Sequence, residues 1–170
     1  MIEKWLQIAD SIAEEIAEAV EANEFSRTFE PSVIWGDRRT ELSKEGELAV
    51  HVVPVNWSTI LDSDGSWRIR CRYQIGVRKR FTAAERDVDG QVIDSEITAL
   101  CQILGELQEW FMPKKPDQDG RRLTDVPSAV WVSDTNEDGE ESIDAMIDWD
   151  WLRDKKMFLG WFDLTFEADG

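Results

Sequence analysis

The chain has 170 residues, the length of one ordinary domain, and 42% of them are apolar, which argues against general disorder. Its 36 acidic and 19 basic residues give a formal net charge of −17, which disfavours nonspecific binding to DNA or to anionic membranes. No apolar run approaches membrane-spanning length, and the acidic N-terminal stretch does not resemble a signal peptide.

The first part of the chain is expected to form a helix followed by two strands. Apolar residues at three- and four-residue steps predict an amphipathic helix that ends near Asn23. Residues 27–35 are expected to form a short strand, which Pro31 restricts to a sheet edge or an irregular start. Residues 47–57 are rich in β-branched side chains and predict a second strand, where Pro54 marks a bulge or a strand exit.

Residues 67–81 are the most distinctive stretch, because they hold six basic residues and no acidic one. Apolar and polar residues alternate there with a strict period of two, which predicts a strand with one apolar and one basic face. The apolar face, expected in the core, carries Trp67, Ile69, Cys71, Tyr73, Ile75 and Val77. The opposite face carries Arg68, Arg70, Arg72, Gln74, Gly76 and Arg78.

The remainder of the chain adds a helix and two strands. The apolar stripe of residues 91–111 predicts a helix, and residues 128–134 and 157–167 predict strands. Residues 135–156 form an acidic insertion or arm between these two strands. The order α-β-β-β-α-β-β predicts a single α+β domain over residues 1–170, with one antiparallel sheet of four to five strands and two helices packed on it.

The sequence offers little support for catalytic chemistry. His51 is the only histidine, lies in a predicted strand and has no nearby Ser or Cys partner, so we expect a structural role for it. The many carboxylates single out no catalytic pair, and no phosphate-binding or zinc-binding motif is present. We therefore expect neither an enzyme nor a bound cofactor. Cys71 and Cys101 are expected to be buried free thiols, which fits folding in the cytosol.

Residues 134–142 carry a partial calcium-loop pattern. Asp134, Asn136 and Asp138 offer oxygen ligands at alternate positions and precede a glycine, as the first half of a calcium loop requires. The second half fails, because Ala145 stands where the bidentate Glu belongs. Asp-Gly also recurs at several predicted turns of this chain. We therefore expect no metal site, and these three residues are the candidates if calcium binds.

The basic face of residues 67–81 has three interpretations. Direct DNA binding conflicts with the net charge of −17. The face could instead be solvated and neutralised by acids on neighbouring strands, or it could be a subunit or partner interface, where arginine pairs with carboxylates and stacks on tryptophan. The last two interpretations are compatible and both stay open. With two tryptophans of the insertion added, the interface candidates are Arg68, Arg70, Arg72, Arg78, Arg80, Trp149 and Trp151.

Several segments, in their order along the chain, resemble the tail terminator (tail completion) proteins of tailed bacteriophages. The segments are IADSIAEEIAEAV, FSRTFEPSVIW, LAVHVVPV, the arginine-rich YQIGVRKRF, VIDSEITALCQILGELQEWF and the closing MFLGWFDLTFE. The resemblance covers most of residues 1–134 and 157–167, and it lies in layout and loose pattern rather than in an invariant motif. The insertion at 135–156 departs from the pattern of the family.

This resemblance implies a structural protein of the virion without catalytic residues. Such proteins are small α+β subunits that form a ring, expected here to be a hexamer, on the finished tail tube. The implied partners are other copies of the chain, the tail tube protein and the head–tail connector protein, with assembly in the host cytoplasm and no membrane. DNA would pass through the ring without specific binding, since an acidic lumen repels it. The alternatives are a head-completion or neck connector protein and a Trp-rich ligand-binding module.

Overall fold

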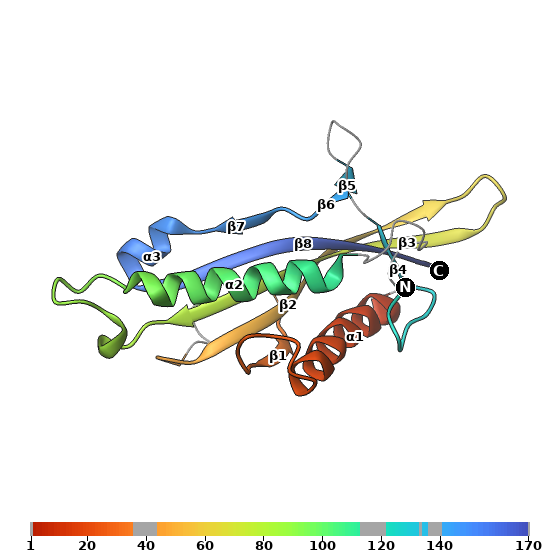
Figure 1. Ribbon diagram of the computed structural model, residues 1–170. Helices are drawn as coiled ribbons and strands as arrows, with labels where there is room; N and C mark the ends of the chain where they lie inside the picture. The colour runs from red at the N-terminus through yellow and green to blue at the C-terminus, as the bar shows by residue number, and fades with distance from the viewer. Residues whose placement is uncertain (1, 36–43, 113–121, 133, 136–140, 170) are drawn as a thin grey trace.

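A sheet with two long helices on one face forms the body of the protein (Figure 1). The computed structural model describes residues 2–35, 44–112, 122–132, 134–135 and 141–169. The helices are α1 (Ile2–Glu21), α2 (Asp94–Phe111) and the short α3 (Trp149–Lys155), and a 3₁₀ turn covers Ala83–Glu85. The strands are β1 (Glu30–Val33), β2 (Leu48–Leu61), β3 (Trp67–Arg80), β4 (Val130–Val132), β5 (Asp134–Thr135), β6 (Glu141–Ser142), β7 (Ala145–Ile147) and β8 (Met157–Asp169).

The main sheet has six strands in the order β1-β2-β3-β8-β4, with β7 also paired to β8. The pairs that involve β3 and β8 are antiparallel, whereas β1 runs parallel to β2. Parallel neighbours cannot be joined by a tight hairpin turn and need a longer crossover, which the long connection between β1 and β2 provides. The predicted α+β class is confirmed, and the parallel edge strand is a feature that the expectation of an antiparallel sheet did not include.

The core lies between the sheet and helices α1 and α2. All apolar side chains of β3 from Ile69 to Val77 that face the helices are fully buried, as their alternation predicts. Fully burying one such side chain stabilises the fold by roughly 1.5–3 kcal/mol. Tyr73 in the middle of this row donates its hydroxyl proton to the backbone oxygen of Trp5 at 2.8 Å. This bond ties the central strand to the first turns of α1.

A bulge interrupts β2 at Pro54–Asn56, where the register with β3 shifts. The proline has no amide N–H to give to the ladder, so the strand accommodates it with one extra residue. Before the bulge Val52 lies opposite Ile75, and after it Trp57 lies opposite Cys71. The bulge therefore keeps Trp57 on the same side of the sheet as Val52, toward the helices.

Part of the predicted insertion at 135–156 joins the body of the protein. β7 pairs with β8, and Ile147 packs against the core. The next helix, α3, begins at an N-cap, because the Asp148 side chain accepts a hydrogen bond from the Trp151 amide at 3.0 Å. The helix ends at Lys155, and the following residue, Lys156, has a φ of 53°. The left-handed turn at Lys156 leads directly into β8.

Candidate functional site

The sheet face turned away from α1 and α2 carries the arginines of β3. In the antiparallel register with β8, Arg70 lies opposite Glu167, and Arg72 lies opposite Thr165, two residues from Asp163. Side chains alternate with a period of two on both strands, so arginines and carboxylates form facing rows. The carboxylate row was missed in the sequence, although Asp163 and Glu167 alternate with buried apolar residues of the last strand.

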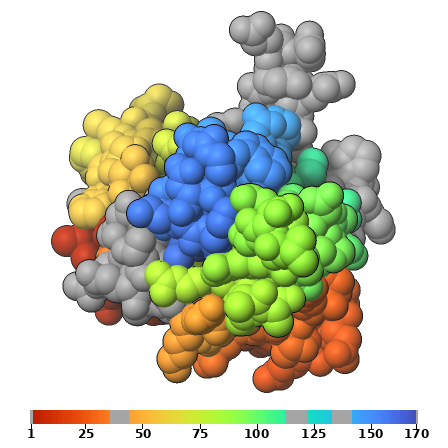
Figure 2. Space-filling model, turned by 90° about the vertical axis from the view of Figure 1, so that its left-hand side faces the viewer, coloured from red at the N-terminus to blue at the C-terminus, as the bar shows by residue number. Residues whose placement is uncertain are grey.

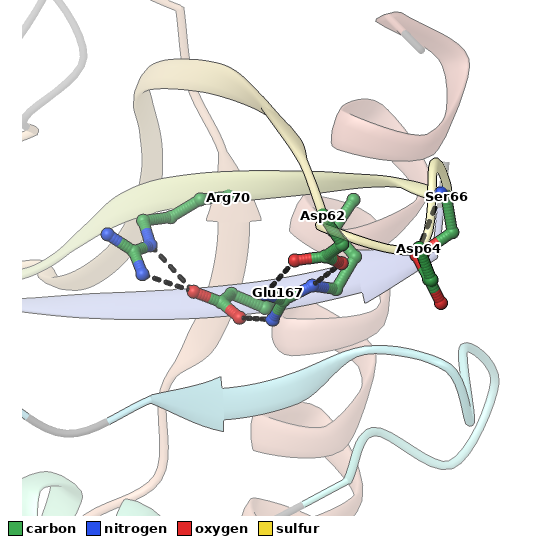
Figure 3. Close-up of polar contacts among 6 residues, drawn as sticks. Asp62, Asp64, Ser66, Arg70 and Glu167 are labelled. Carbon is green, nitrogen blue, oxygen red and sulfur yellow. Dashed lines mark hydrogen bonds and ion pairs between the residues drawn. The ribbon is translucent and has the colours of Figure 1, made fainter.

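Six residues, Arg68, Arg70, Arg72, Asp62, Asp163 and Glu167, make up an arginine–carboxylate ladder on this face. Figure 3 labels three of them, Asp62, Arg70 and Glu167. Arg68 donates to both oxygens of Asp62, from Nε at 2.5 Å and from Nη2 at 2.7 Å. Arg70 donates from Nε to Glu167 Oε1 at 2.7 Å. Glu167 also pairs with Arg68, and Asp163 pairs with Arg72. One carboxylate of β8 therefore bridges two guanidinium groups.

Two members of the ladder, Arg68 and Asp62, have a pKa shifted in the direction expected for an ion pair. The hydrogen bond from Arg68 lowers the pKa of the Asp62 carboxyl, and Asp62 together with the charge of Glu167 raises the pKa of Arg68. The basic face is thus neutralised by acids of the same chain, which is one of the two interpretations left open by the sequence. A contact of these half-exposed arginines with another subunit stays a prediction.

Arg78 differs from the ladder arginines because its side chain is fully buried. Its Nη2 lies 2.5 Å from Nε2 of His51, and Nδ1 of that imidazole lies 2.9 Å from Oγ of Ser32. An enclosed cavity of about 10 Å³ lies beside this pair, lined in part by apolar side chains such as Trp161. That volume is about what one water molecule occupies, so the site has no room for a ligand. Arg78, predicted as an interface residue, lies inside the chain.

The partners of His51 determine its tautomer. A guanidinium group only donates, so Nε2 of His51 accepts from Arg78, and the proton must be on Nδ1. Nδ1 therefore donates its proton to the oxygen of the Ser32 hydroxyl. Because a protonated Nδ1 has no free lone pair, it cannot remove the proton of that hydroxyl. Burial and the charge of Arg78 lower the pKa of His51 to about 4, so the ring is neutral at pH 7. The Ser32–His51 pair, which the sequence did not predict, is thus structural and does not activate the serine.

The last two basic residues of β3 lie in different surroundings. Lys79 is buried on the helix side, and its Nζ lies 2.5 Å from Glu85 and 3.3 Å from Glu96. Burial would raise the pKa of Glu85, but the hydrogen bonds from Lys79 and from the Thr82 amide lower it. Arg80, an interface candidate, is exposed at the end of the strand. These contacts anchor the start of α2 to the end of β3.

The other predicted site residues lie at two places. In α3, Trp149 is exposed and Trp151 is half-buried. Of the three calcium candidates, Asp134 is the first residue of β5, whereas Asn136 and Asp138 lie outside the described residues. Among the residues that the structure does describe, no group of three His, Cys, Asp or Glu side chains is placed to hold a metal ion.

A cluster of tryptophans near α1 is a further surface feature that the sequence did not locate. The indole of Trp5 lies against those of Trp57 and Trp35, with ring centroids 4.4 and 5.4 Å apart. Trp5 is buried, whereas Trp35 and Trp57 are exposed. Farther along the β2–β3 hairpin, Leu61 and Trp67 are more exposed still. Trp67 was predicted in the core, but it lies where β3 extends past the end of α1.

Comparison of the sequence with models of known protein families and with curated proteins found no match. No helix in the described part of the chain is both long and apolar enough to cross a membrane. The site residues must therefore be interpreted from their own geometry. That geometry consists of a neutralised sheet face, a structural histidine and exposed apolar side chains at the ends of the sheet.

Proposed function

We propose that this protein is a structural component of a bacteriophage tail, a tail terminator that assembles as a ring on the tail tube. The observation that carries the proposal is the exposure of large apolar side chains on a well-packed subunit, above all Trp35, Trp57, Trp67 and Trp149. Exposed indoles are typical of contact surfaces between proteins and are a liability on a protein that stays alone.

The layout of the fold adds support. The segments that resemble tail terminators form α1, the β2–β3 hairpin, α2 and the long closing strand β8, which lie together as one body. The interior polar groups near His51 have structural partners and no ligand-sized cavity. An assembly role requires no catalytic constellation, and the geometry of the Ser32–His51 pair is consistent with that.

The acidic composition also suits a ring through which DNA passes. With a net charge of −17, each subunit would contribute negative potential to the lumen, and this potential would keep the genome from adhering to the wall. Carboxylates of the ladder neutralise Arg68, Arg70 and Arg72, so these arginines do not offset the negative potential. A head-completion or neck connector protein also needs exposed contact surfaces and a wall to which DNA does not adhere, so it is the second candidate.

The two candidates differ in the partner that they bind. Purified protein should bind to the ends of tail tubes isolated without their terminator, and negative-stain electron microscopy should show a ring at one end of each tube. Native mass spectrometry of the bound material should give one defined oligomer, which we expect to be a hexamer. Binding to head connectors but not to tubes would favour the neck protein, and a chain that binds neither structure would contradict both assignments.

A further inference from the structure

The distal half of β2, residues 55–61, is an open edge of the main sheet in the part of the chain that the structure describes. The pairing of β1 with β2 ends at Val52, whose carbonyl oxygen accepts from the Ile34 amide at 3.0 Å. Beyond this point β2 continues to Leu61 with β3 on its inner side and no described strand on its outer side (Figure 1). Residues 55–61 are exposed except for Ile60, which is half-buried. Such an edge offers its backbone to a further strand.

The register of β2 with β3 shows which backbone groups point out of the sheet at this edge. Val52 directs its carbonyl outward to the Ile34 amide and lies opposite an odd-numbered residue of β3. Backbone groups alternate in direction along a strand, so every residue of β2 opposite an odd-numbered residue of β3 points outward. Trp57 and Leu61 are two of these residues. The outer edge therefore presents the hydrogen-bonding pattern of a regular strand.

The exposed apolar side chains of the protein gather around this edge. Among the described residues ten large apolar side chains are exposed, and six of them belong to this end: Ile2, Trp35, Val55, Trp57, Leu61 and Trp67. Figure 2 looks onto the opposite end, where the blue residues around α3 lie beside the light-green residues that lead into α2. Three of the ten belong to that end: Val88, Ile93 and Trp149. A contact at the open edge would therefore remove the larger share of exposed apolar surface from water.

The open edge also carries no charge. Residues 55–61 include no Asp, Glu, Lys or Arg, although 32% of the whole chain is charged. Edge strands are commonly protected from self-association by charged side chains, and this one is not. Two copies with a net charge of −17 each repel one another over most of their surfaces, so an uncharged strand is where they can meet. The adjacent acid, Asp62, is already paired with Arg68.

We propose that residues 57–61 of two copies pair as antiparallel edge strands and join the two sheets across a twofold axis. The register that pairs all of these residues sets Trp57 of each copy opposite Leu61 of the other, on the helix side of the sheet. In this register Asp62 lies opposite Asn56, so no two acids face each other. The segment is thus complementary to itself in backbone, apolar side chains and charge, which favours a second copy over an unrelated strand.

This contact goes beyond the tail function proposed above and does not depend on it. A contact between two identical surfaces is isologous and closes at two copies, whereas a ring needs a contact between two different surfaces. The twofold pairing is therefore the state of the free chain, separate from any ring on a tail tube. Trp149, at the opposite end, stays available for other contacts.

Sedimentation velocity of the purified full-length chain, without tail tubes, tests the dimer. Leu61→Lys adds a charge to the edge and removes an apolar contact, so it should raise the Kd of the dimer by about tenfold or more. Met146→Lys is the matched control, because Met146 is 59% exposed on β7, away from the open edge. Leu61 is 57% exposed, so both variants should fold, which near-UV circular dichroism checks. The control should dimerise as the wild type does.

Disulfide trapping tests the register. Ser58 of one copy should lie opposite Ile60 of the other in a non-hydrogen-bonded pair, where Cα atoms are about 4.5 Å apart and within reach of a disulfide. A mixture of Ser58→Cys and Ile60→Cys proteins, treated with an added thiol oxidant, should give a disulfide-linked dimer with one chain of each. Neither protein alone should form this dimer. The wild type controls for Cys71 and Cys101, which are buried and half-buried.

Three outcomes would overturn the proposal: a wild-type chain that stays monomeric, a Leu61→Lys dimer as tight as that of the wild type, or a mixture that gives no mixed disulfide. Disulfide-linked dimers of the Ser58→Cys protein alone would indicate another register and contradict the pairing stated here. Binding to tail tubes is measured separately. A free chain that stays monomeric yet caps tubes would refute the dimer alone, and a chain that dimerises through the edge but binds no tubes would refute the tail function alone.

Discussion

Arg78 places a permanent positive charge against His51 inside the sheet, and this contact determines the behaviour of the histidine. A protonated imidazole would lose its hydrogen-bond acceptor and repel the guanidinium group. Burial of the ring is the larger cause, and together with the charge of Arg78 it lowers the pKa of His51 to about 4 from an ordinary value of 6.5. In the unfolded chain the same group regains the ordinary value. Folding therefore excludes a proton that the unfolded chain binds below pH 6.5.

This linkage predicts an acid sensitivity specific to His51. Between pH 6.5 and pH 4 the unfolded state binds more protons than the folded state, so the free energy of unfolding falls as the pH falls. The loss attributable to His51 should reach about 3 kcal/mol at the low end of this range. In His51→Gln the amide can accept from Arg78 and donate to Ser32 but does not titrate. Urea unfolding at several pH values should show a shallower decline for His51→Gln, and parallel curves for both proteins would contradict the assignment.

The contact between α2 and β8 shows how closely two elements of this fold approach each other. Gly160 lies on the core side of β8, and a Cβ atom at this position would be 2.8 Å from Cδ2 of Leu104 on α2. The same atom would be 3.0 Å from the ring of Phe158. Both neighbours are buried and cannot move freely. The absence of a side chain at Gly160 therefore sets the distance between the helix and the strand.

Two glycine substitutions should have opposite effects on stability. Gly160→Ala should lower the free energy of unfolding by about 1–3 kcal/mol, since overpacking forces α2 away from the sheet. At Gly105, within α2, an added Cβ atom would have no other atom within 4 Å. Gly105→Ala should therefore raise the free energy of unfolding by roughly 0.5–1 kcal/mol, because alanine favours the helix. Urea unfolding followed by tryptophan fluorescence measures both changes. A neutral Gly160→Ala would show that the interface relaxes more easily than the packing suggests.

The elements that the sequence predicts best are those with uninterrupted periodicity. The alternation in β3 and the apolar stripes of α1 and α2 predict both the elements and their buried faces, because one physical pattern defines each of them. Contacts between distant elements have no such signal. The pairing of Glu167 with Arg68 and Arg70 depends on β8 lying next to β3, and the pairing of Ser32 with His51 depends on a parallel strand.

At the scale of the whole molecule, charge is distributed so that cations are mostly neutralised where they occur. The arginines of the ladder are matched by carboxylates of β8 and of the hairpin turn, and Lys79 is matched by two glutamates. The excess of acids then dominates the field outside the protein. A phosphate backbone approaching the ladder would have to compete with carboxylates already bound to the guanidinium groups.

DNA binding should therefore be absent at physiological salt and appear when the ladder is opened. The double variant Asp163→Asn, Glu167→Gln releases all three ladder arginines from β8 carboxylates. In low salt it should bind labelled duplex DNA more tightly than wild type, as fluorescence anisotropy measures, and added salt should abolish this binding. The control Glu3→Gln, Glu109→Gln makes the same change in net charge on exposed helix positions. Tight DNA binding by wild type, or equal binding by both variants, would contradict the role of the ladder.

The bulge in β2 makes the spacing of the chain more important than the identity of the residue that supplies it. Val55 is the unpaired residue of the bulge, and a ladder that took it in without a bulge would exchange the two sides of the distal strand. Trp57 would then leave the vicinity of Trp5 and, with Leu61, join the arginines. Ser58 and Ile60 would then turn toward the helices. Among relatives of this protein, substitutions at Val55 should therefore be common, whereas insertions or deletions of one residue between Trp57 and Leu61, which this bulge does not absorb, should be selected against.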